Sequence, residues 1–316
     1  MSRRSQAFTV TAIAEELDDA RVAAITQALT GAGADVGVTE RRSERAPAVV
    51  AIEITAPGSD APAREQARAL RHTLLAACCP AGDIDIAVTD AAVSAPGPRL
   101  LVADMDSTLI EIEVIDELAR RHGVHDEVAA VTARAMRGEL DFEASLRARV
   151  ARLAGLDASV MADLAARLPI MPGAAALVRG IKRAGGWAAV VSGGFTFGTA
   201  AVAARLGLDH AFANELVIAG GRLTGEVVDP VVTPERKAQV IDELAGRHGL
   251  ARERVVAVGD GANDLLMLAR AGLGVAFHAK PRVAAAADTA LTTGGLERVL
   301  YVLGWRRADV DALFAP

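Results

Sequence analysis

The sequence predicts an α/β fold in which a parallel-sheet domain with a helical insertion follows a smaller α+β domain. Its 316 residues favour two domains, at roughly 100–200 residues per domain. Residues 1–92 alternate short strand-like and helix-like segments. From Arg99 onward, short and nearly continuous apolar runs recur between long helical segments. Such runs are typical of strands that are buried on both faces of a parallel sheet.

The first domain, residues 1–92, shows two helical patterns among four strand patterns. Strands are predicted at 8–13, 36–40, 49–54 and 84–88, and helices at 19–30 and 64–77. The order β-α-β-β-α-β is that of a ferredoxin-like sandwich. In topology this domain resembles the ACT domain, a small regulatory module that often binds amino acids and pairs through its sheet. The resemblance implies an amino-acid effector and a homodimer.

A linker at residues 93–98, rich in Pro, Gly and Ser, separates the domains. The second domain, residues 99–316, has four apolar runs that predict core strands. They are 100–103, 188–191, 255–258 and 274–277. The segment from about 112 to 184 has helical spacing and almost no strand pattern, so it is predicted to be a helical cap. A β-hairpin is expected at 214–228, with its turn at Gly220 and Gly221.

Composition excludes several classes of partner. The formal net charge of −6 argues against a broad nucleic-acid or anionic-membrane surface, because such partners require clustered Lys and Arg. No apolar run approaches the ~18 residues that a membrane span needs. The two cysteines, Cys78 and Cys79, are adjacent and therefore poorly placed to bridge each other, which predicts reduced thiols and a cytoplasmic protein.

The strongest chemical signal is the segment 100–110, LLVADMDSTLI. A buried strand is predicted to end here, so that Asp104 and Asp106 lie at its carboxyl edge, where ligands bind in open α/β sheets. Two acids this close repel each other unless a cation or a shared proton relieves them. The pair therefore favours a Mg²⁺ site, because this ion prefers oxygen ligands, or a nucleophile beside a general acid and base. Surface acids with this spacing are also common, which leaves the pair weak on its own.

A second apolar strand leads into Ser192, Gly193 and Gly194. A hydroxyl followed by unhindered backbone N–H groups can hold phosphate oxygens, although a plain strand-to-helix turn has the same pattern. Lys237 falls in the first turn of a helix predicted to begin after Thr233. A cation is mildly disfavoured there by the helix dipole, which indicates a nearby anion, whereas most lysines are simply solvated.

A third apolar strand leads into Asp260, and Asn263 and Asp264 then open a helix. An Asx-rich helix cap would look similar. Nevertheless, three strands that each deliver polar side chains at their carboxyl ends would bring all these residues to one rim of the sheet. The sequence therefore predicts a single site on that rim.

In order along the chain, these segments resemble the four motifs of the haloacid-dehalogenase superfamily. Within it, the chain resembles the phosphoserine phosphatases, in residues 104–108, Glu113, 135–138, 141–142, 192–195 and 259–264. The resemblance covers residues 99–303. It implies a Rossmann-like core with a parallel sheet and a helical cap insertion. It also implies hydrolysis of phosphoserine to serine and inorganic phosphate, the final step of serine biosynthesis.

The resemblance assigns catalytic roles to the rim. Asp104 is the expected nucleophile, which becomes an aspartyl-phosphate, and Asp106 the expected general acid and base. Mg²⁺ is expected to bind the carboxylates of Asp104 and Asp260 and the backbone carbonyl of Asp106. Asp264 is expected to orient metal-bound water from outside the first coordination sphere.

The resemblance also assigns the residues that bind phosphate. Lys237, Ser192 and the backbone amide of Gly193 are expected to neutralise the phosphoryl oxygens, which is the main means of catalysis in phosphoryl transfer. Asn263 is expected to contact the phosphate or the neighbourhood of Lys237.

Substrate choice is expected to depend on the cap. By resemblance, Glu113 binds the substrate ammonium and Arg149 its carboxylate, while Met136 and Phe142 form apolar walls. Spacing alone does not separate Arg149 from Arg147 and Arg152 on the same predicted helix, and a solvated helical face explains any of the three.

Two other readings of the sequence were weighed. The same machinery could serve another small phosphomonoester, or pass the phosphate to another hydroxyl as a phosphotransferase. Alternatively, the chain could be a non-catalytic amino-acid sensor whose second domain is an inactive scaffold. The second alternative is disfavoured because every catalytic position carries a chemically competent residue.

Overall fold

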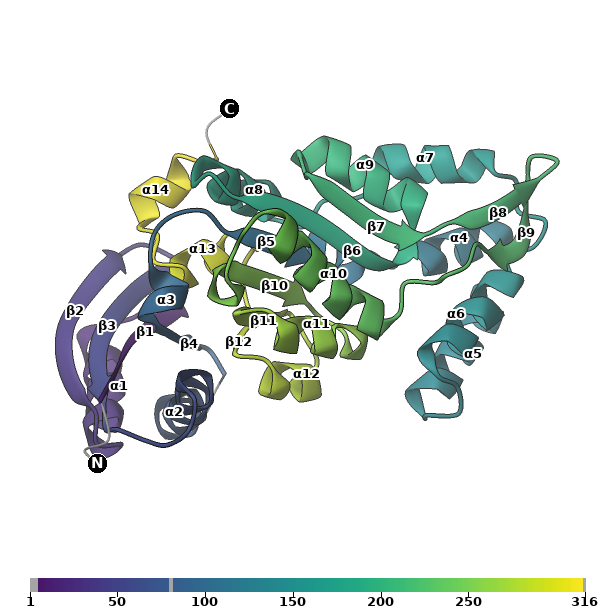
Figure 1. Cartoon of the computed structure of the whole chain (residues 1–316). Helices are drawn as coiled ribbons and strands as arrows, with labels where there is room; N and C mark the ends of the chain where they lie inside the picture. The colour runs from purple at the N-terminus through teal and green to yellow at the C-terminus, as the bar shows by residue number, and fades with distance from the viewer. Residues whose placement is uncertain (1–4, 80–81, 315–316) are drawn as a thin grey trace.

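Two separate β-sheets organise the chain (Figure 1). In this computed structural model, residues 5–79 and 82–314 are described. The predicted domains also include residues 1–4, 80–81 and 315–316, which lie outside the described residues. A four-stranded antiparallel sheet forms near the N-terminus, and a six-stranded parallel sheet forms in the larger part of the chain. The predicted α/β class, with a smaller α+β unit in front, is confirmed.

The N-terminal sheet has the strand order β2-β3-β1-β4, and each neighbouring pair is antiparallel. Its elements are β1 (Gln6–Ala14), α1 (Asp19–Gly31), β2 (Asp35–Ser43), β3 (Ala48–Ala56), α2 (Ala63–Cys78) and β4 (Asp85–Asp90). Asp18 starts α1 by accepting a hydrogen bond from the backbone N–H of Arg21 at 2.8 Å. Ile25 and Leu29 of α1 and Leu74 of α2 are fully buried against the sheet. The predicted ferredoxin-like order is therefore observed.

The parallel sheet has the order β12-β11-β10-β5-β6-β7. Its strands are β5 (Leu100–Ala103), β6 (Trp187–Phe195), β7 (His210–Asn214), β10 (Val255–Gly259), β11 (Leu273–Phe277) and β12 (Thr289–Leu291). The four predicted strands occupy the centre, where both faces are covered and the apolar runs are continuous. The edge strands β7 and β12 were not predicted, because each is short and β7 reads His-Ala-Phe-Ala-Asn without an apolar run.

Helices cover both faces of this sheet (Figure 1). One face packs against α8 (Ala174–Arg183), α9 (Thr196–Leu206) and α13 (Arg298–Val302). The other packs against α10 (Pro234–Arg247), α11 (Leu265–Arg270) and α12 (Pro281–Ala286). Leu101 and Ala103 of β5 belong to the first core, and Leu100 and Val102 to the second, as alternation along a strand requires.

Between β5 and β6 lie the helices of the predicted cap. They are α4 (Val114–His122), α5 (His125–Met136), α6 (Phe142–Ala151) and α7 (Ser159–Arg167). Helix α8, which falls inside the predicted cap segment of about 112–184, packs instead against β5, β6 and α13. Sequence periodicity could not make this distinction, because a helix that covers a sheet and a helix that covers a site are both amphipathic.

The predicted hairpin is formed by β8 (Leu216–Ala219) and β9 (Arg222–Val227). It follows β7 directly and is hydrogen-bonded to the end of α6 and the loop after it. Leu223 in β9 accepts a hydrogen bond from the N–H of Gly155 at 2.8 Å and donates one to the carbonyl of Leu156 at 2.9 Å. The hairpin therefore ties the parallel sheet to the cap.

A charged cluster joins α2 of the N-terminal unit to the parallel-sheet core. The buried carboxylate of Asp288, just before β12, accepts hydrogen bonds from Arg64 at 2.6 Å and from Arg68 at 2.7 Å. It also accepts one from the backbone N–H of Gly274 at 2.6 Å. Arg64 donates in addition to the carbonyls of Leu268 and Ala269 at the end of α11.

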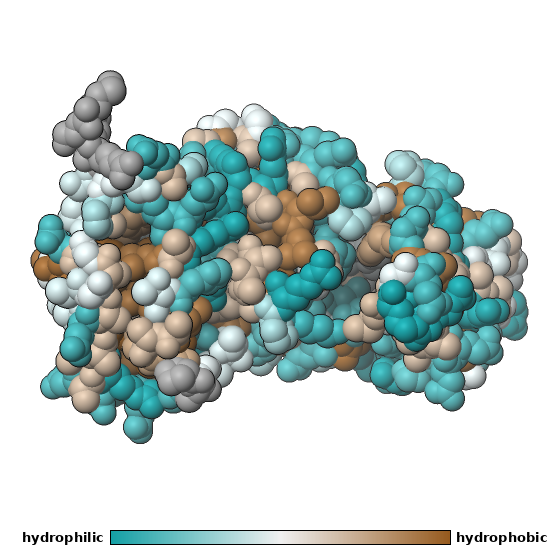
Figure 2. Space-filling model, turned by 90° about the horizontal axis from the view of Figure 1, so that it is seen from below, coloured by the Kyte–Doolittle hydropathy of each residue, from teal (hydrophilic) through white to brown (hydrophobic). Residues whose placement is uncertain are grey.

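The segment that connects the two sheets begins with a one-turn helix, α3 (Ala91–Ser94), and continues to β5 without regular structure. At the other end of the chain, α14 (Arg307–Asp311) packs its Val310 into the core. Figure 2 shows hydrophilic residues over most of one face of the molecule, with hydrophobic residues in separate areas among them. Among the described residues, no helix is both long and apolar enough to cross a bilayer.

The Asp288 cluster generates a stability prediction. We expect Asp288→Asn to lower the free energy of unfolding by about 1.5–3 kcal/mol, because the hydrogen bonds from two arginines lose the negative charge and one oxygen of their acceptor. Urea denaturation followed by circular dichroism measures this change. Asp242→Asn is the matched control: its pair with Arg270 is half exposed, and such pairs contribute about 0–1 kcal/mol. Equal losses in the two variants would contradict the assignment.

Candidate active site

The carboxyl end of β5 turns sharply at residues 104–109. Asp104 is buried, and its Oδ1 accepts a hydrogen bond from the backbone N–H of Met105 at 2.8 Å. Two residues further on, Ser107 has a φ of 56°, a left-handed conformation that is uncommon for residues other than glycine. Its hydroxyl donates to Glu113 Oε1 at 2.8 Å. This turn reverses the chain and leaves both acids of the first motif at the rim of the sheet.

Lys237 lies at the centre of the rim and is completely buried. Its Nζ lies 2.7 Å from Asp104 Oδ1 and 2.8 Å from Asp264 Oδ1. Asp264 in turn accepts the backbone N–H of Gly261 with its other oxygen, at 3.0 Å. The helix dipole therefore does not decide the position of this lysine; two carboxylates from β5 and from the loop after β10 hold it.

The carboxyl-terminal end of β6, where its pairing with β7 is irregular, places a hydroxyl and two glycines beside these groups. Ser192 is buried, and its Oγ accepts a hydrogen bond from the N–H of Gly194 at 2.8 Å. A Cβ on Gly193 would lie 2.7 Å from the ring of Phe142, and one on Gly194 would lie 2.6 Å from Asp106 Oδ2. Glycine is therefore required at both positions, because the cap approaches one and the second acid approaches the other.

Asp106 is half-buried, and its Oδ1 accepts the backbone N–H of Val114 at 3.2 Å. Burial raises the pKa of Asp106 well above its ordinary value, and the nearby charges of Glu113 and Asp104 raise it further. This shift favours the protonated form of Asp106 over a wider pH range than for an ordinary carboxyl group. Asp106 can therefore donate a proton as a general acid.

Asp104 and Asp260 also have raised pKa values. Burial, then repulsion from Asp264, raises the pKa of Asp104 to about 8 and that of Asp260 to about 7, although Lys237 opposes both shifts. The pKa of Lys237 is raised, because attraction to Asp104 and Asp264 outweighs burial, which alone would lower it. One lysine thus faces more negative charge than it can balance.

The arrangement of these carboxylates fits a divalent cation. Single carboxylate oxygens of Asp104, Asp260 and Asp264 all lie within 4.8 Å of one another. Thr108 donates to Asp260 Oδ1 at 3.0 Å and orients that carboxylate. A hard cation would relieve the repulsion that raises the pKa values of Asp104 and Asp260. The side chain of Asp106 does not belong to this group, so its predicted contribution through the backbone carbonyl stays a prediction.

The cap brings some of the predicted substrate residues to the site. The position of Phe142 against Gly193 places the first turn of α6 over the carboxyl-terminal end of β6. Burial lowers the pKa of Arg149, and attraction by Glu113, Asp116 and Asp106 opposes that change, so these charges face one another. Asn263 is half-buried behind Gly261. Met136, at the end of α5, is 67% exposed, and no contact shown here brings it to the rim.

The structure separates the three arginines of α6 that sequence spacing could not. Arg147 pairs with Glu143 and Asp229, and Arg152 lies 3.5 Å from Glu127. Arg149 has no ion pair within 4.0 Å among residues 5–79 and 82–314 and donates only to the carbonyl of Ser145. Its guanidinium is therefore the one of the three that remains available to a ligand.

Sequence reasoning missed Asn214, at the end of edge strand β7. This buried amide donates to the carbonyl of Gly193 at 2.8 Å and accepts the N–H of Val232 at 2.7 Å. It therefore joins the end of β6 to the segment that leads into α10. Its only sequence signal is a polar residue between apolar segments, which many surface positions share.

Together, the capped parallel sheet and the carboxylate cluster at its rim define a metal-assisted α/β hydrolase. A family profile described as haloacid dehalogenase-like hydrolase matches residues 101–269. The chain belongs to this family, as the four motifs together predicted.

Individual relatives agree with this assignment. A phosphoserine phosphatase of Streptomyces coelicolor is 46% identical over 303 residues, 96% of this chain and 72% of that protein. One of Mycobacterium tuberculosis is 48% identical over 72% of this chain, which spans 56% of that protein. A probable phosphoserine phosphatase of Vibrio cholerae, crystallised without ligand, superposes with a TM-score of 0.70 at 35% identity, covering 99% of this chain and 90% of that one. A substrate-bound phosphoserine phosphatase superposes with a TM-score of 0.61 at 40% identity, covering 65% and 97%.

The close approach of Gly194 to Asp106 generates a prediction for catalysis. We expect Gly194→Ala to lower kcat on phosphoserine by about 10²–10⁴, because the new methyl group displaces the carboxyl group of Asp106, the expected general acid for the poor alkoxide leaving group. Steady-state kinetics measure the effect. Gly246→Ala in α10 is the matched control, since its Cβ would meet nothing within 4 Å. Full activity of Gly194→Ala would contradict the role of Asp106.

Proposed function

We propose that this protein is a phosphoserine phosphatase, which hydrolyses O-phosphoserine to serine and inorganic phosphate through an aspartyl-phosphate on Asp104. The observation that carries the proposal is the pairing of Asp104 with the buried Lys237 beside the acidic cluster, with Arg149 near enough to be influenced by the charges of Glu113 and Asp106. The similarity to phosphoserine phosphatases supports the choice of substrate.

In the first step, a carboxylate oxygen of Asp104 forms a bond to phosphorus while the bond from phosphorus to the serine oxygen breaks. Within the described chain, both hydrogen bonds to the Asp104 carboxylate fall on Oδ1, which leaves Oδ2 for the attack. Asp106 gives its proton to the departing serine oxygen. In the second step Asp106 takes a proton from water, the water oxygen bonds to phosphorus, and the bond to Asp104 breaks.

Positive and dipolar groups receive the charge on the phosphoryl oxygens. Two of these groups lie on β6, the strand next to β5: the hydroxyl of Ser192 and the backbone N–H of Gly193. The third, Lys237, lies on α10, which packs against β5. Asn263 adds an amide at the opposite end of the rim. Such fixed donors lower the barrier because they need no reorganisation during the reaction.

Mg²⁺ is the proposed cation, held by Asp104 and Asp260, with the backbone carbonyl of Asp106 as a further oxygen ligand. Bound there, it would supply positive charge to the phosphoryl group. Asp264 keeps its hydrogen bonds to Lys237 and Gly261, so we place it outside the first coordination sphere, where it fixes those groups and orients metal-bound water.

The substrate contacts follow from charge. Glu113 is proposed to bind the ammonium group of phosphoserine, and Arg149 its carboxylate. Ser107 holds Glu113 in place through its hydroxyl, and Phe142 closes the pocket from the cap. Met136 is proposed as a second apolar wall, which its exposed position on α5 allows only if the cap closes over the site.

Three further assignments belong to the proposal. An amino-acid effector and a homodimer are supported by the ferredoxin-like topology of the N-terminal sheet, whose edge strand β2 carries the exposed Val38. A cytoplasmic location is supported by Cys78 and Cys79, which are both free thiols.

Release of inorganic phosphate tests the proposed function. With Mg²⁺, we expect the protein to release phosphate from phosphoserine with a kcat/KM at least ~10-fold above that for phosphothreonine or small phosphorylated alcohols, since the alcohols lack the two charged groups and phosphothreonine adds a methyl group. Asp104→Asn should abolish turnover while its circular dichroism spectrum stays unchanged. A higher kcat/KM for another phosphomonoester would favour a different substrate. Transfer of phosphate to an added alcohol would favour a phosphotransferase, and no turnover on any phosphomonoester would favour the sensor.

Arg149 generates a specificity prediction. We expect Arg149→Ala to lower kcat/KM for phosphoserine by about 10- to 150-fold, the loss of a charged hydrogen bond of about 1.5–3 kcal/mol. Hydrolysis of p-nitrophenyl phosphate, which lacks the carboxylate, should be retained. Arg147→Ala is the matched control on the same helix, because its guanidinium already pairs with Glu143 and Asp229. Equal loss on both substrates would defeat the assignment.

The raised pKa values generate a prediction for metal binding. Protons compete with the cation for Asp104, with a pKa of about 8, and for Asp260, with a pKa of about 7. Affinity for Mg²⁺ should therefore fall at least ~10-fold as the pH falls from 8 to 6. Calorimetric titrations in two buffers of different ionisation enthalpy should show proton release at pH 7.

The same pKa shifts determine whether the free energy of unfolding rises or falls with pH. Without metal, the folded protein keeps protons that the unfolded chain loses above its ordinary carboxyl pKa, so stability should decrease as the pH rises from about 4 to 8. Added Mg²⁺ should restore it. In Asp104→Asn both effects should shrink, because one of the titrating groups is gone. Metal affinity that is independent of pH would contradict this account.

A further inference from the structure

A small cavity lies where the interdomain linker meets the parallel-sheet core. Its volume is about 140 Å³, below the roughly 300–1,000 Å³ of sites for drug-sized ligands. The linker contributes Pro96, Gly97 and Arg99, and the core contributes Ile181, Ala184 and Trp305. Arg99 immediately precedes β5, so the cavity lies at the end of this strand opposite to Asp104.

The charge of Arg99 has no counterpart. Its side chain is 4% exposed; Nη2 donates to the carbonyl of Ala95 at 2.5 Å, whereas Nη1 is buried and makes no hydrogen bond with any described residue. Burial lowers the pKa of Arg99 to about 10, and repulsion from Arg254 adds to the shift. Within the described chain, no carboxylate lies within 4.0 Å of either guanidinium.

Arg254 adds a second positive charge to this corner of the molecule. Its guanidinium donates to three linker carbonyls, those of Ala95 at 2.7 Å, Pro98 at 3.0 Å and Pro96 at 3.2 Å. These bonds satisfy its donors but bring no negative charge. The linker thus offers Arg99 and Arg254 only neutral backbone oxygens as hydrogen-bond acceptors.

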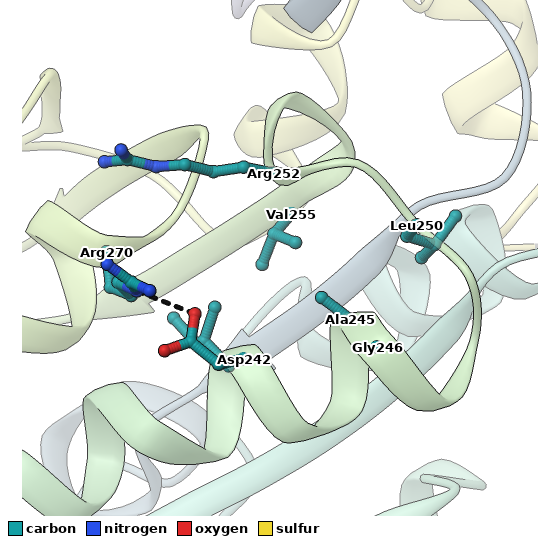
Figure 3. A pocket seen from close by; sticks show the side chains of 8 residues that line it. Asp242, Ala245, Gly246, Leu250, Arg252, Val255 and Arg270 are labelled. Atoms are coloured by element: carbon teal, nitrogen blue, oxygen red, sulfur yellow. Dashed lines mark hydrogen bonds and ion pairs between the residues drawn. The ribbon is translucent and has the colours of Figure 1, made fainter.

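A groove elsewhere on the core shows the contrasting arrangement. This hollow of about 600 Å³, between α10 and the end of α11, also contains two arginines, Arg252 and Arg270 (Figure 3). There, however, Asp242 lies 2.7 Å from Arg270, as the dashed line in Figure 3 marks. The groove thus carries its own counter-charge, and the cavity at Arg99 does not.

A buried charge without a partner is costly, because it loses its hydration and gains nothing in return. A ligand that supplied negative charge and a hydrogen-bond acceptor would remove this cost. Oxyanions suit a guanidinium best, since their oxygens accept short, charge-assisted hydrogen bonds from it. The volume of about 140 Å³ leaves no room for an extended molecule.

We propose that the cavity between the linker and the core is a binding site for a small oxyanion, a carboxylate or a phosphate, with Arg99 as its main ligand. The site is separate from the rim that carries Asp104. A bound anion would contact the linker through Arg99 and the core through α8 and the segment around Trp305. Occupancy would therefore strengthen the attachment of the linker to the core.

Trp305 provides a local signal for the test. The chain contains only two tryptophans, so in a Trp187→Phe background all tryptophan fluorescence comes from the cavity wall. In this background, titration with sodium phosphate, sodium formate, L-serine or sodium chloride, without divalent metal, should change the fluorescence saturably for at least one oxyanion. Chloride should have a weaker effect at the same ionic strength. The responses to phosphate, formate and serine distinguish an inorganic source of the anion from an organic one.

Two variants locate the response. Arg99→Met removes the charge at similar volume and should abolish the fluorescence change and the rise of Tm with oxyanion. Ala184→Leu fills the cavity but keeps Arg99, so it should do the same if Arg99→Met does not fold. Arg282→Met is the matched control, because Arg282 is exposed on α12, and it should respond like its parent. An oxyanion that binds at the active site would affect all these variants equally. Differences between the variants therefore report on the cavity alone.

Three results would overturn the proposal. They are the absence of any saturable response in the parent, an undiminished response in both Arg99→Met and Ala184→Leu, and a response to chloride equal to that of every oxyanion. Loss of the response in either cavity variant, with Arg282→Met unchanged, would support it.

Discussion

The interaction on which the rest of the site depends is the contact of the buried Lys237 with Asp104 and Asp264. It joins three separate elements: the end of β5, the loop after β10 and the first turn of α10. An unpaired ammonium group could not remain at the centre of the protein, so the lysine needs both acids. The acids in turn need more positive charge than one lysine provides, which is the physical reason for a cation site at this position.

Glycines and one amide complete the site by geometry rather than by charge. Gly193 and Gly194 let the cap and Asp106 approach the end of β6, and Asn214 fixes that end to the segment before α10. None of these three residues titrates. The groups at the rim of the sheet can therefore be held rigidly by packing and by hydrogen bonds to neutral groups.

Much of this arrangement could be predicted from the sequence, because buried strands and helix patterns are local properties. The central strands and the convergence of Asp104, Ser192, Lys237 and Asp260 on one rim follow from the rule that parallel strands end on the same side. The edge strand β7 and the role of Asn214 depend on contacts between distant segments, which no local pattern records. The availability of Arg149 could be recognised only once the partners of Arg147 and Arg152 were known.

Arg64 reaches from the N-terminal unit to the last carbonyls of α11, and α11 begins immediately after Asp264. With its two bonds to Asp288, this single side chain makes four hydrogen bonds to the core. Any sliding of α2 must therefore break these bonds or move a helix of only six residues that begins directly after Asp264, the partner of Lys237. Arg64 and α11 thus link the position of the N-terminal unit to the contact between Asp264 and Lys237.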